Sequence, residues 1–438
     1  MNYYSLNRQS PDVDFKEATI KGQAPDKGLY FPRQIPKIED SFFKNIENVD
    51  DVEIGMRVLS PFTEGVLPES ELYSIVKDTI NFDIPLIPVN ESISSLELYH
   101  GPTLAFKDLG ARFMSRCLRH FSKDRSEKIV VLVATSGDTG GAVANGFYDV
   151  EGVEVIILFP SGKVSAVQEK QLTTLGKNIH ALEIDGSFDD CQKMVKQAFV
   201  DSDLTKQFFL TSANSINVAR WLPQQLYYFF AYKQWLRSNS EAPVISVPSG
   251  NFGNICAGLL AHVSGLPVKH FIAACNANKV IPDFLKTQNY TPQKAIPTIS
   301  NAMDVGDPSN FVRILELFDN EFIKIKNILS SESISDEETK RTIQRVEKDY
   351  DYLLDPHGAV GYLALENYLK SSGHRAGVFL ETAHPIKFND TVELLTQQVI
   401  PIPESIKLIL KKEGKTTKLA TRFIELKDYL LQNKQQFN

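Results

Sequence analysis

Short apolar runs alternate with glycine-rich turns and helix-like stretches from residue 128 onward. Continuous apolar runs of this length are typical of strands buried on both faces, and their alternation with helices predicts mostly parallel sheets covered by helices. The sequence therefore indicates an α/β fold. The runs are KIVVLVAT (128–135), VEVIILFP (153–160), NIHALEID (178–185), PVISVPSG (243–250), VKHFIAACN (268–276) and GVFLETAHP (377–385).

The rest of the chain shows weaker patterns. The first hundred residues are expected to be mostly helical and irregular, because prolines and turn signals interrupt them. A helix is predicted to begin near Lys107, where apolar residues recur at helical spacing. The polar, acidic stretch 330–342 is interpreted as a helix start, and the last residues, from 411 on, as an amphipathic helix with a frayed end.

Charge and cysteine content exclude several classes of partner. The 438 residues include 47 basic and 54 acidic side chains, a net charge of −7, and no basic block that would favour nucleic acid or an anionic membrane. Four scattered cysteines without metal-ligand spacing favour a reducing cytoplasm, and we expect no catalytic metal. The polar start and the lack of a run of about 18 apolar residues argue against a targeting signal or a membrane span.

Glycine-rich turns follow three of the predicted strands, in SGDTGG, SGK and SGNFGN. In α/β folds such turns bring backbone N–H groups and helix N-termini to the carboxyl ends of strands, where anions bind. The turn at 249–254 is a candidate phosphate site; a helix cap in a tight turn is the alternative. None of the turns matches the dinucleotide or P-loop patterns, which argues against a nicotinamide dehydrogenase or an NTPase.

Two further residues are candidates for chemistry. Lys107, in GPTLAFKD, is either an ordinary surface lysine or a partly desolvated amine that forms a Schiff base. Thr382, in ETAHP, follows a predicted strand and either caps a turn or is the hydroxyl partner of a pyridine nitrogen. His357 and His384 each adjoin a proline and are expected to fix turns.

GPTLAFKD, ATSGDTGG, VPSGNFGN and ETAHP, in this order, resemble the pyridoxal-phosphate enzymes of the tryptophan-synthase-β fold, also called fold type II. The resemblance is closest to threonine synthases of the longer bacterial and fungal type. It is also carried by GQAPDKGLYFP, SGKVSAVQEKQLTTLG, SANSINVARWLPQ and SNAMDVGDPSNFVR. We expect it to cover about the first nine-tenths of the chain and not the last forty or so residues.

The resemblance implies two lobes of mostly parallel sheet plus an N-terminal segment, with the site between the lobes. We expect the N-terminal segment at 1–95, a smaller lobe at 96–215 and a larger lobe at 216–438. The cofactor would be pyridoxal 5'-phosphate, with Lys107 as its Schiff-base lysine and proton carrier, and Asp138 near its phenolic oxygen. Thr382 would meet the pyridine nitrogen. The phosphate would be bound by Ser249, Gly250, Asn251, Phe252, Gly253 and Asn254.

The implied reaction converts O-phospho-L-homoserine and water to L-threonine and phosphate. The substrate is an anion, so cationic and hydroxyl side chains within the matched segments are its candidate ligands. Alternatives are another lyase of the fold, such as a serine or threonine dehydratase or a cysteine synthase, and a non-catalytic binder of phosphate esters. We expect a monomer or homodimer. The candidate substrate ligands are Thr103, Ser136, Thr139, Lys163, Asn217, Arg220 and Arg313.

Overall fold

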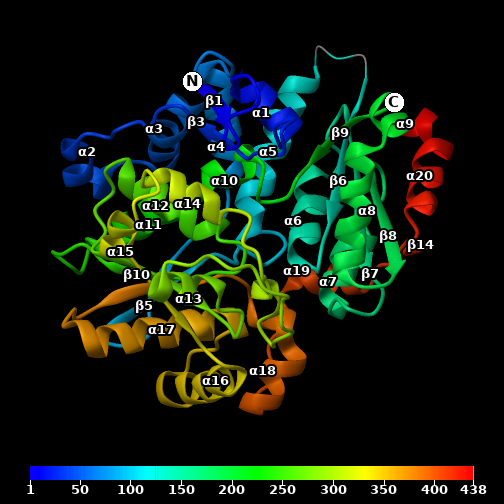
Figure 1. Ribbon diagram of the computed structural model, residues 1–438. Coiled ribbons are helices and arrows are strands. Elements are labelled where there is room, and N and C mark those ends of the chain that lie inside the picture. The colour runs from blue at the N-terminus through cyan, green and yellow to red at the C-terminus, as the bar shows by residue number, and fades with distance from the viewer. Residues whose placement is uncertain (124, 126, 438) are drawn as a thin grey trace. The chain divides into compact units, whose positions relative to one another are not determined.

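The computed structural model describes residues 1–123, 125 and 127–437, and the chain divides into two compact units (Figure 1). Unit 1 comprises Met1, Phe31–Phe106 and Trp221–Pro401, and unit 2 comprises Asn2–Tyr30, Lys107–Arg220 and Ile402–Asn438. These bounds differ from the three consecutive segments that the sequence led us to expect. Asn2–Tyr30 and Ile402–Asn438 both belong to unit 2. Their packing partners are distant in sequence, so the local sequence pattern did not indicate this.

Unit 2 contains a five-stranded, wholly parallel sheet in the order β14-β8-β7-β6-β9. Three of its strands were expected from their apolar runs. The strands are β6 (Ile129–Ala134), β7 (Val153–Pro160), β8 (Ile179–Asp185), β9 (Phe209–Ser212) and β14 (Thr417–Ala420).

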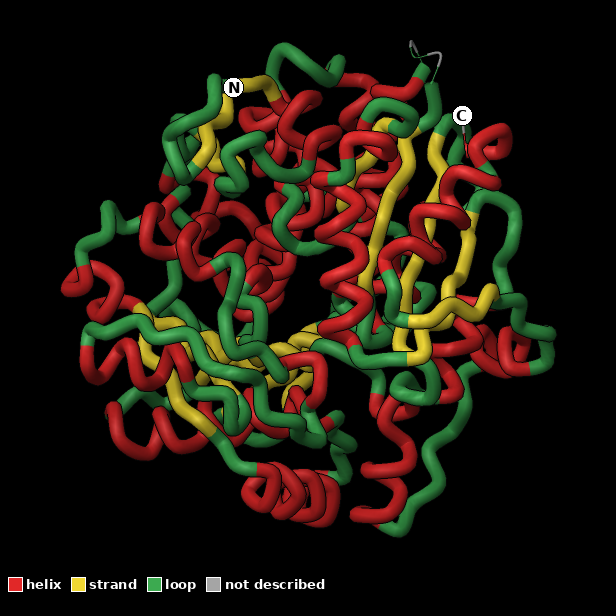
Figure 2. The backbone as a smooth tube through the Cα atoms, turned by 45° about the vertical axis from the view of Figure 1, so that its right-hand side comes forward, coloured by secondary structure: helices red, strands yellow, loops and turns green. Residues whose placement is uncertain are grey.

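Helices cover both faces of this sheet, as the flanking of yellow strands by red helices shows in Figure 2. Helices α8 (Phe188–Val200) and α20 (Phe423–Gln432) form one core with alternate residues of the strands, among them Leu132, Ile156 and Leu182. The intervening strand residues, such as Val131 and Ile157, are equally buried under the other face. There α6 (Asp138–Phe147) packs on β7, between α5 (Lys107–Ser122) and α7 (Ala166–Thr173). This double burial explains the continuous apolar runs.

Unit 1 contains a six-stranded sheet in the order β12-β11-β10-β13-β5-β4, in which only the edge strand β4 is antiparallel. Helix α17 (Pro356–Ser372) packs on β13 and β10, with α16 (Asp336–Tyr350) beside it. Helix α12 (Gly253–Val263) connects β10 to β11 and packs on α11 (Gln225–Trp235) and α14 (Phe311–Leu317). The strands are β4 (Leu86–Pro88), β5 (Ile93–Glu97), β10 (Val244–Pro248), β11 (His270–Cys275), β12 (Leu329–Ser333) and β13 (Gly377–Glu381).

The remaining elements are short. A small sheet of β1 (Asn2–Ser5), β2 (Val13–Asp14) and β3 (Tyr30–Pro32) corrects the expectation that the start of the chain is only helical and irregular. The other helices are α1 (Phe15–Lys21), α2 (Asp40–Asn45), α3 (Asp51–Thr63), α4 (Glu69–Thr79), α9 (Ser202–Thr205), α10 (Val218–Trp221), α13 (Val280–Thr287), α15 (Phe322–Ile328), α18 (Asn389–Thr396), α19 (Glu404–Leu410) and α21 (Lys434–Phe437), with 3-10 turns η1 (Ile46–Asn48), η2 (Leu222–Gln224), η3 (Asn301–Met303) and η4 (Pro385–Phe388).

The sheet of unit 1 brings three of the candidate motifs to one edge. Strands β10, β13 and β5 are parallel neighbours, so their carboxyl ends lie side by side. These ends lead into the loop 249–254, Thr382 and the turn GPTLAF, respectively. Ligands of open α/β sheets bind at this edge. Within the described part of the chain, no helix combines the length and the apolar character that a membrane crossing requires.

Candidate active site

The loop 249–254 connects β10 to α12 and is tightly packed. Phe252 precedes the helix with a left-handed backbone (φ 59°), a conformation that bulky residues adopt only under constraint. A Cβ atom on Gly250 would lie 2.6 Å from Cα of Met303, so only glycine fits against this neighbouring segment. The loop therefore keeps its backbone close to residues 302–303.

Hydrogen bonds fix the loop from several sides. Ser249 Oγ donates to the carbonyl oxygen of Val247 at 2.8 Å. The side-chain oxygen of Asn251 accepts from the N–H of Ser309 at 2.7 Å, and its carbonyl oxygen accepts from Asn310 Nδ2 at 3.0 Å. The loop is thus preorganised by its own unit, which lowers the entropic cost of binding an anion there.

Asn254, in the first turn of α12, has an unsatisfied donor. Its side-chain oxygen accepts from Tyr228 Oη at 2.9 Å, while its Nδ2 is buried and has no hydrogen-bond partner among the described residues. A buried amide without a partner is costly, and the N-terminus of α12 adds a positive partial charge. The loop therefore fits the phosphate group of a cofactor: it offers an unpaired donor, a helix N-terminus and a glycine at the point of closest approach.

Thr382 and the turn before Lys107 are joined by backbone contacts. The N–H of Phe106 donates to the carbonyl oxygen of Thr382 at 2.9 Å, and Ala105 and Ala383 form a β-bridge beside it. Tyr227 Oη donates to the carbonyl oxygen of Phe106. Both backbone groups of the residue before Lys107 are therefore held in place.

The GPT turn is held by a buried cation. Lys387 Nζ donates to the carbonyl oxygen of Thr103 at 2.8 Å, and both side chains are almost completely buried. Leu104, the next residue, has a left-handed backbone (φ 59°). Like Phe252, it is a bulky residue in a strained conformation, which the surrounding contacts must stabilise.

In unit 2, Lys107 and Asp138 each lie in the first turn of a helix, α5 and α6, and the two helices pack together. Lys107 Nζ lies 3.7 Å from Asp138 Oδ2, and both side chains are largely buried. Gln168 Nε2 donates to the other carboxylate oxygen of Asp138 at 2.9 Å. The candidate Schiff-base lysine is therefore part of a buried ion pair. It is not an ordinary surface lysine.

The candidate substrate ligands occupy different environments. Ser136, in the loop after β6, and Thr139, in the first turn of α6, are half-buried on either side of Asp138, and Lys163 is exposed after β7. Thr103 is buried in the GPT turn. Arg220 is buried, donates to the carbonyl oxygen of Ala213, and packs against Gly110 of α5, the helix that begins with Lys107.

Asn217 and Arg313 have structural contacts that account for them. Asn217 Nδ2 donates to the carbonyl oxygens of Thr19 and Ser212, and its Oδ1 accepts from the N–H of Ala219. Arg313 is 0% exposed, lies over the ring of Trp221 at 4.5 Å, and bonds to Asn310. Burial lowers the pKa of Arg313 to about 10, so it keeps its charge at neutral pH. Their assignment to the substrate stays a prediction.

Four residues that contact the candidate site were not predicted from the sequence: Tyr227, Tyr228, Gln168 and Lys387. The tyrosines are adjacent in α11 and bind Phe106 and Asn254, two residues of different motifs. In the sequence they belong to the aromatic run LYYFFAY, which indicates a buried helix and gives no sign of polar contacts. Two of the four had a signal: Lys387 lies two residues after ETAHP, and Gln168 lies within the matched segment SGKVSAVQEKQLTTLG. The expectation that histidines fix turns is confirmed for His384, whose side chain caps η4. His357 lies in the first turn of α17, which Asp355 caps, and its ring bonds to Ala302.

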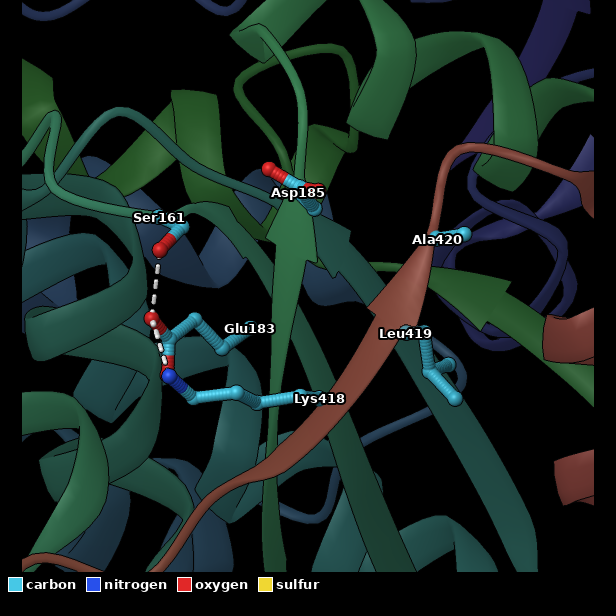
Figure 3. Close-up of a pocket in the computed structure, with 6 residues that line it drawn as sticks. All are labelled: Ser161, Glu183, Asp185, Lys418, Leu419 and Ala420. Carbon is cyan, nitrogen blue, oxygen red and sulfur yellow. Dashed lines mark hydrogen bonds and ion pairs between the residues drawn. The ribbon is translucent and has the colours of Figure 1, made fainter.

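A pocket of about 440 Å³ lies elsewhere in unit 2, at the ends of β7, β8 and β14 (Figure 3). Its Glu183 accepts from Ser161 Oγ at 2.6 Å and lies 3.7 Å from Lys418 Nζ, so the carboxylate is already compensated. None of the candidate site residues lines this pocket. The described residues also contain no group of histidine, cysteine and carboxylate side chains that could hold a metal ion.

Comparison with known proteins identifies the class first. A family model described as "Pyridoxal-phosphate dependent enzyme" matches residues 93–381, a stretch that carries every candidate site residue except Thr382, which directly follows it. The chain is thus a pyridoxal-phosphate-dependent enzyme with an α/β fold. Two further models, "Threonine synthase N terminus" and "Threonine synthase, C-terminal", match residues 2–80 and 358–430. The chain belongs to the threonine synthase family.

Individual relatives agree over their full lengths. The threonine synthase of Haemophilus influenzae is 42% identical over 433 residues, which cover 99% of this chain and 100% of the relative. The crystal structure of threonine synthase from Escherichia coli superposes with a TM-score of 0.91 at 39% identity, covering 99% of this chain and 100% of the other. A pyridoxal-phosphate-bound threonine synthase from Brucella melitensis superposes with a TM-score of 0.93 at 33% identity, with 99% of both chains covered. The expectation that the resemblance ends before the last forty residues is therefore wrong.

Proposed function

We propose that this chain converts O-phospho-L-homoserine and water to L-threonine and inorganic phosphate, the last step of threonine biosynthesis. The observation that carries the proposal is the match to threonine synthases at 42% identity over nearly the whole chain. The preorganised loop 249–254 supports it independently, because its unpaired donor and helix N-terminus suit a phosphorylated cofactor.

The residues of unit 1 would hold the cofactor. The loop from Ser249 to Asn254 would bind its phosphate through backbone N–H groups and Asn254 Nδ2, and the hydroxyl of Thr382 would meet its pyridine nitrogen. When bound, pyridoxal phosphate supplies an electron sink that stabilises negative charge at a substrate carbon. A neutral hydroxyl partner, unlike a carboxylate, does not enforce protonation of the ring nitrogen.

Lys107 would bind the cofactor covalently and, once the substrate has displaced it, carry protons. Its Nζ would take a proton from the α-carbon and release it before it takes a second proton from the β-carbon. Protons would be returned to the γ-carbon, which becomes the methyl group when the phosphate has left, and to the α-carbon after water has added at the β-carbon. Asp138, 3.7 Å away, would hold the amine in position and stabilise it when it is charged. Gln168 would keep the Asp138 carboxylate oriented through its 2.9 Å hydrogen bond.

The substrate would be bound by cationic and hydroxyl side chains of the matched segments. We assign its anionic groups to Arg220, Ser136, Thr139 and Lys163, and its carboxylate also to the turn that contains Thr103. Arginine suits a phosphate or carboxylate through paired hydrogen bonds. A small-molecule substrate is consistent with the family. We also propose that the enzyme is cytoplasmic and that it is a monomer or homodimer. Light scattering of the purified protein would measure its oligomeric state.

The test combines spectroscopy and turnover. Purified protein should show an absorption band of bound cofactor in the near-ultraviolet to violet, and should release phosphate from O-phospho-L-homoserine. Lys107→Ala should lose the Schiff-base band and phosphate release, whereas Lys196→Ala, on the exposed face of α8, should keep both. A band with deamination of serine or threonine but no phosphate release would assign the chain to another lyase of this fold. Absence of any band after addition of pyridoxal phosphate would leave only a non-catalytic phosphate binder.

A further inference from the structure

A buried polar network in unit 1 connects Thr382 to the loop that contains Gly250. The first contact is at Glu381, the residue before Thr382 and the last residue of β13. Glu381 is fully buried, and its Oε1 accepts from the backbone N–H of Asp355 at 2.7 Å. A Cβ atom on Gly358 would lie 1.5 Å from Glu381 Oε2, so the first turn of α17 leaves space for this carboxyl group.

The second contact is between Asp355 and His357. Asp355 caps α17 by accepting from the N–H of His357 at 2.8 Å, and its Oδ1 lies 2.5 Å from Nδ1 of the same histidine. His357 Nε2 accepts from the backbone N–H of Ala302 at 3.2 Å. Because Nε2 accepts, Nδ1 carries the proton and donates it to Asp355. His357 is 2% exposed, so water does not compete for these bonds.

The last contact joins Ala302 and Met303 to the phosphate loop. Cα of Met303 and the carbonyl oxygen of Ala302 lie 2.6 and 3.0 Å from the position of a Cβ on Gly250. Asp304, the next residue, holds this segment through Thr298 and Asn276 at 2.7 and 2.9 Å. A shift of Ala302 would therefore reach the backbone of Gly250 directly.

We propose that Glu381, Asp355 and His357 are positioning residues that link Thr382 to Gly250, so that one buried network sets both ends of the cofactor site. This inference rests on the proposed function, because it assigns the network to the cofactor. Burial, together with the nearby Asp355 carboxylate, raises the pKa of Glu381 well above its usual range. A pKa raised in this direction favours the neutral form of Glu381 in the dry interior beside Asp355.

Two substitutions of His357 distinguish its contact with Asp355 from its contact with Ala302. Asn at position 357 can place a donor near the Nδ1 position and keep the bond to Asp355, but it is too short to reach Ala302. Gln can place an acceptor near the Nε2 position and keep the bond to Ala302. We expect His357→Asn to weaken binding of pyridoxal phosphate by the apoprotein about five- to tenfold, as for one lost hydrogen bond, and His357→Gln to remain within about twofold of wild type.

Binding of pyridoxal, which lacks the phosphate, distinguishes a loss of positioning of the phosphate loop from general damage to the cofactor site. Since the network acts on the phosphate loop through Ala302, His357→Asn should change the affinity for pyridoxal by less than about twofold. Equal weakening of both ligands, or equal affinities in the two variants, would overturn the proposal. Glu381→Gln should behave as wild type, since amide and neutral acid have the same shape, whereas Glu381→Leu should shift the absorption maximum of the bound cofactor. An unchanged maximum in Glu381→Leu would also count against it.

Wild-type protein provides a measurement that does not depend on a variant that folds. Adding pyridoxal phosphate to the apoprotein should slow hydrogen exchange in residues 300–304 and 355–358 as well as in the loop 249–254. Protection confined to that loop and to the segment around Lys107 would overturn the proposal. Failure of the proposed function would look different, because wild type would then show no cofactor band, or a band without phosphate release.

Discussion

The carbonyl oxygen of Thr382 accepts a 2.9 Å hydrogen bond from the backbone N–H of Phe106, the residue directly before Lys107. The proposed partner of the cofactor ring and the segment that leads into the proposed Schiff-base lysine are therefore joined by one hydrogen bond within unit 1. The carbonyl group of the same peptide segment is held by Tyr227. Thr382 and Tyr227 thus fix the backbone of Phe106, directly before the lysine.

Tyr227→Phe should lower kcat by about three- to tenfold, because one hydrogen bond to the backbone before Lys107 is lost, at a cost of about 1 kcal/mol. Cofactor affinity should change little, since the phosphate loop keeps all its contacts. Steady-state phosphate release, with cofactor in excess, measures kcat. An unchanged kcat would show that the Phe106 carbonyl does not need this donor.

Tyr228→Phe, one residue further along α11, should have the opposite pattern. The lost hydroxyl is the donor to both the carbonyl and the side-chain oxygen of Asn254, each at 2.9 Å. Freed from this bond, the Asn254 amide should bind the cofactor phosphate about fivefold more weakly. Absorption titration of the apoprotein measures this affinity. Tyr362→Phe, which loses a bond to Asn90 away from the loop, is the control and should bind cofactor normally.

Gly137→Ala should destabilise the protein by about 1–3 kcal/mol and reduce turnover. Gly137 has φ 137°, which alanine tolerates poorly, and a Cβ would lie 2.5 Å from the side chain of Gln168, the residue that orients Asp138. Gly176→Ala is the matched control: its φ is also positive, at 68°, but no atom lies within 4 Å. It should cost about 1 kcal/mol and leave turnover unchanged. Denaturant unfolding and phosphate release measure the two effects.

Stability should fall as the pH falls from about 6.5 to about 4. Burial, with a smaller contribution from His374, lowers the pKa of His270 to about 4, so the unfolded chain takes up a proton that the folded chain does not. The stabilisation is complete above the unfolded pKa and is lost on acidification, with a magnitude of about 1–3 kcal/mol. His384 contributes in the same direction, since burial lowers its pKa to about 4.

His270→Phe tests the contribution of one of these groups. Phenylalanine keeps the stack on Tyr368, whose ring lies 4.8 Å away and nearly parallel, but cannot be protonated. The variant should lose less stability than wild type between pH 7.5 and pH 4.5, as measured by urea unfolding at both values. Identical losses in the two proteins would contradict the assignment to His270.

The sequence predicted the strands that are buried on both faces, and it predicted the loops at their carboxyl ends. Of the strands in the two large sheets it missed β4, β5, β9, β12 and β14, because these strands are short or partly polar. The LSSES of β12, for example, runs into the acidic stretch in which a helix start was correctly expected. Such strands form because a neighbouring strand offers hydrogen bonds. The hydrophobicity of the strand's own residues gives no sign of that neighbour.

The residues of the candidate site likewise fall into those that the sequence predicted and those that it did not. Lys107, the loop 249–254 and Thr382 lie in local motifs and were visible in the sequence. Asn217 and Arg313 also lie in such motifs, yet their contacts are structural. The network of Glu381, Asp355 and His357 was not visible, because its three members come together only when α17 packs on β13.

The assembly of unit 2 from Asn2–Tyr30, Lys107–Arg220 and Ile402–Asn438 has a consequence for biosynthesis. Leu426 and Leu430 of α20 complete the core beneath β6, β7 and β8, and β14 covers the edge of β8. A ribosome that has translated only as far as residue 401 therefore carries a nascent chain whose sheet has an open edge and an uncovered apolar face. Synthesis from residue 220 to residue 438 takes about 10–40 s at roughly 5–20 residues per second, and during that time this surface is a target for chaperones.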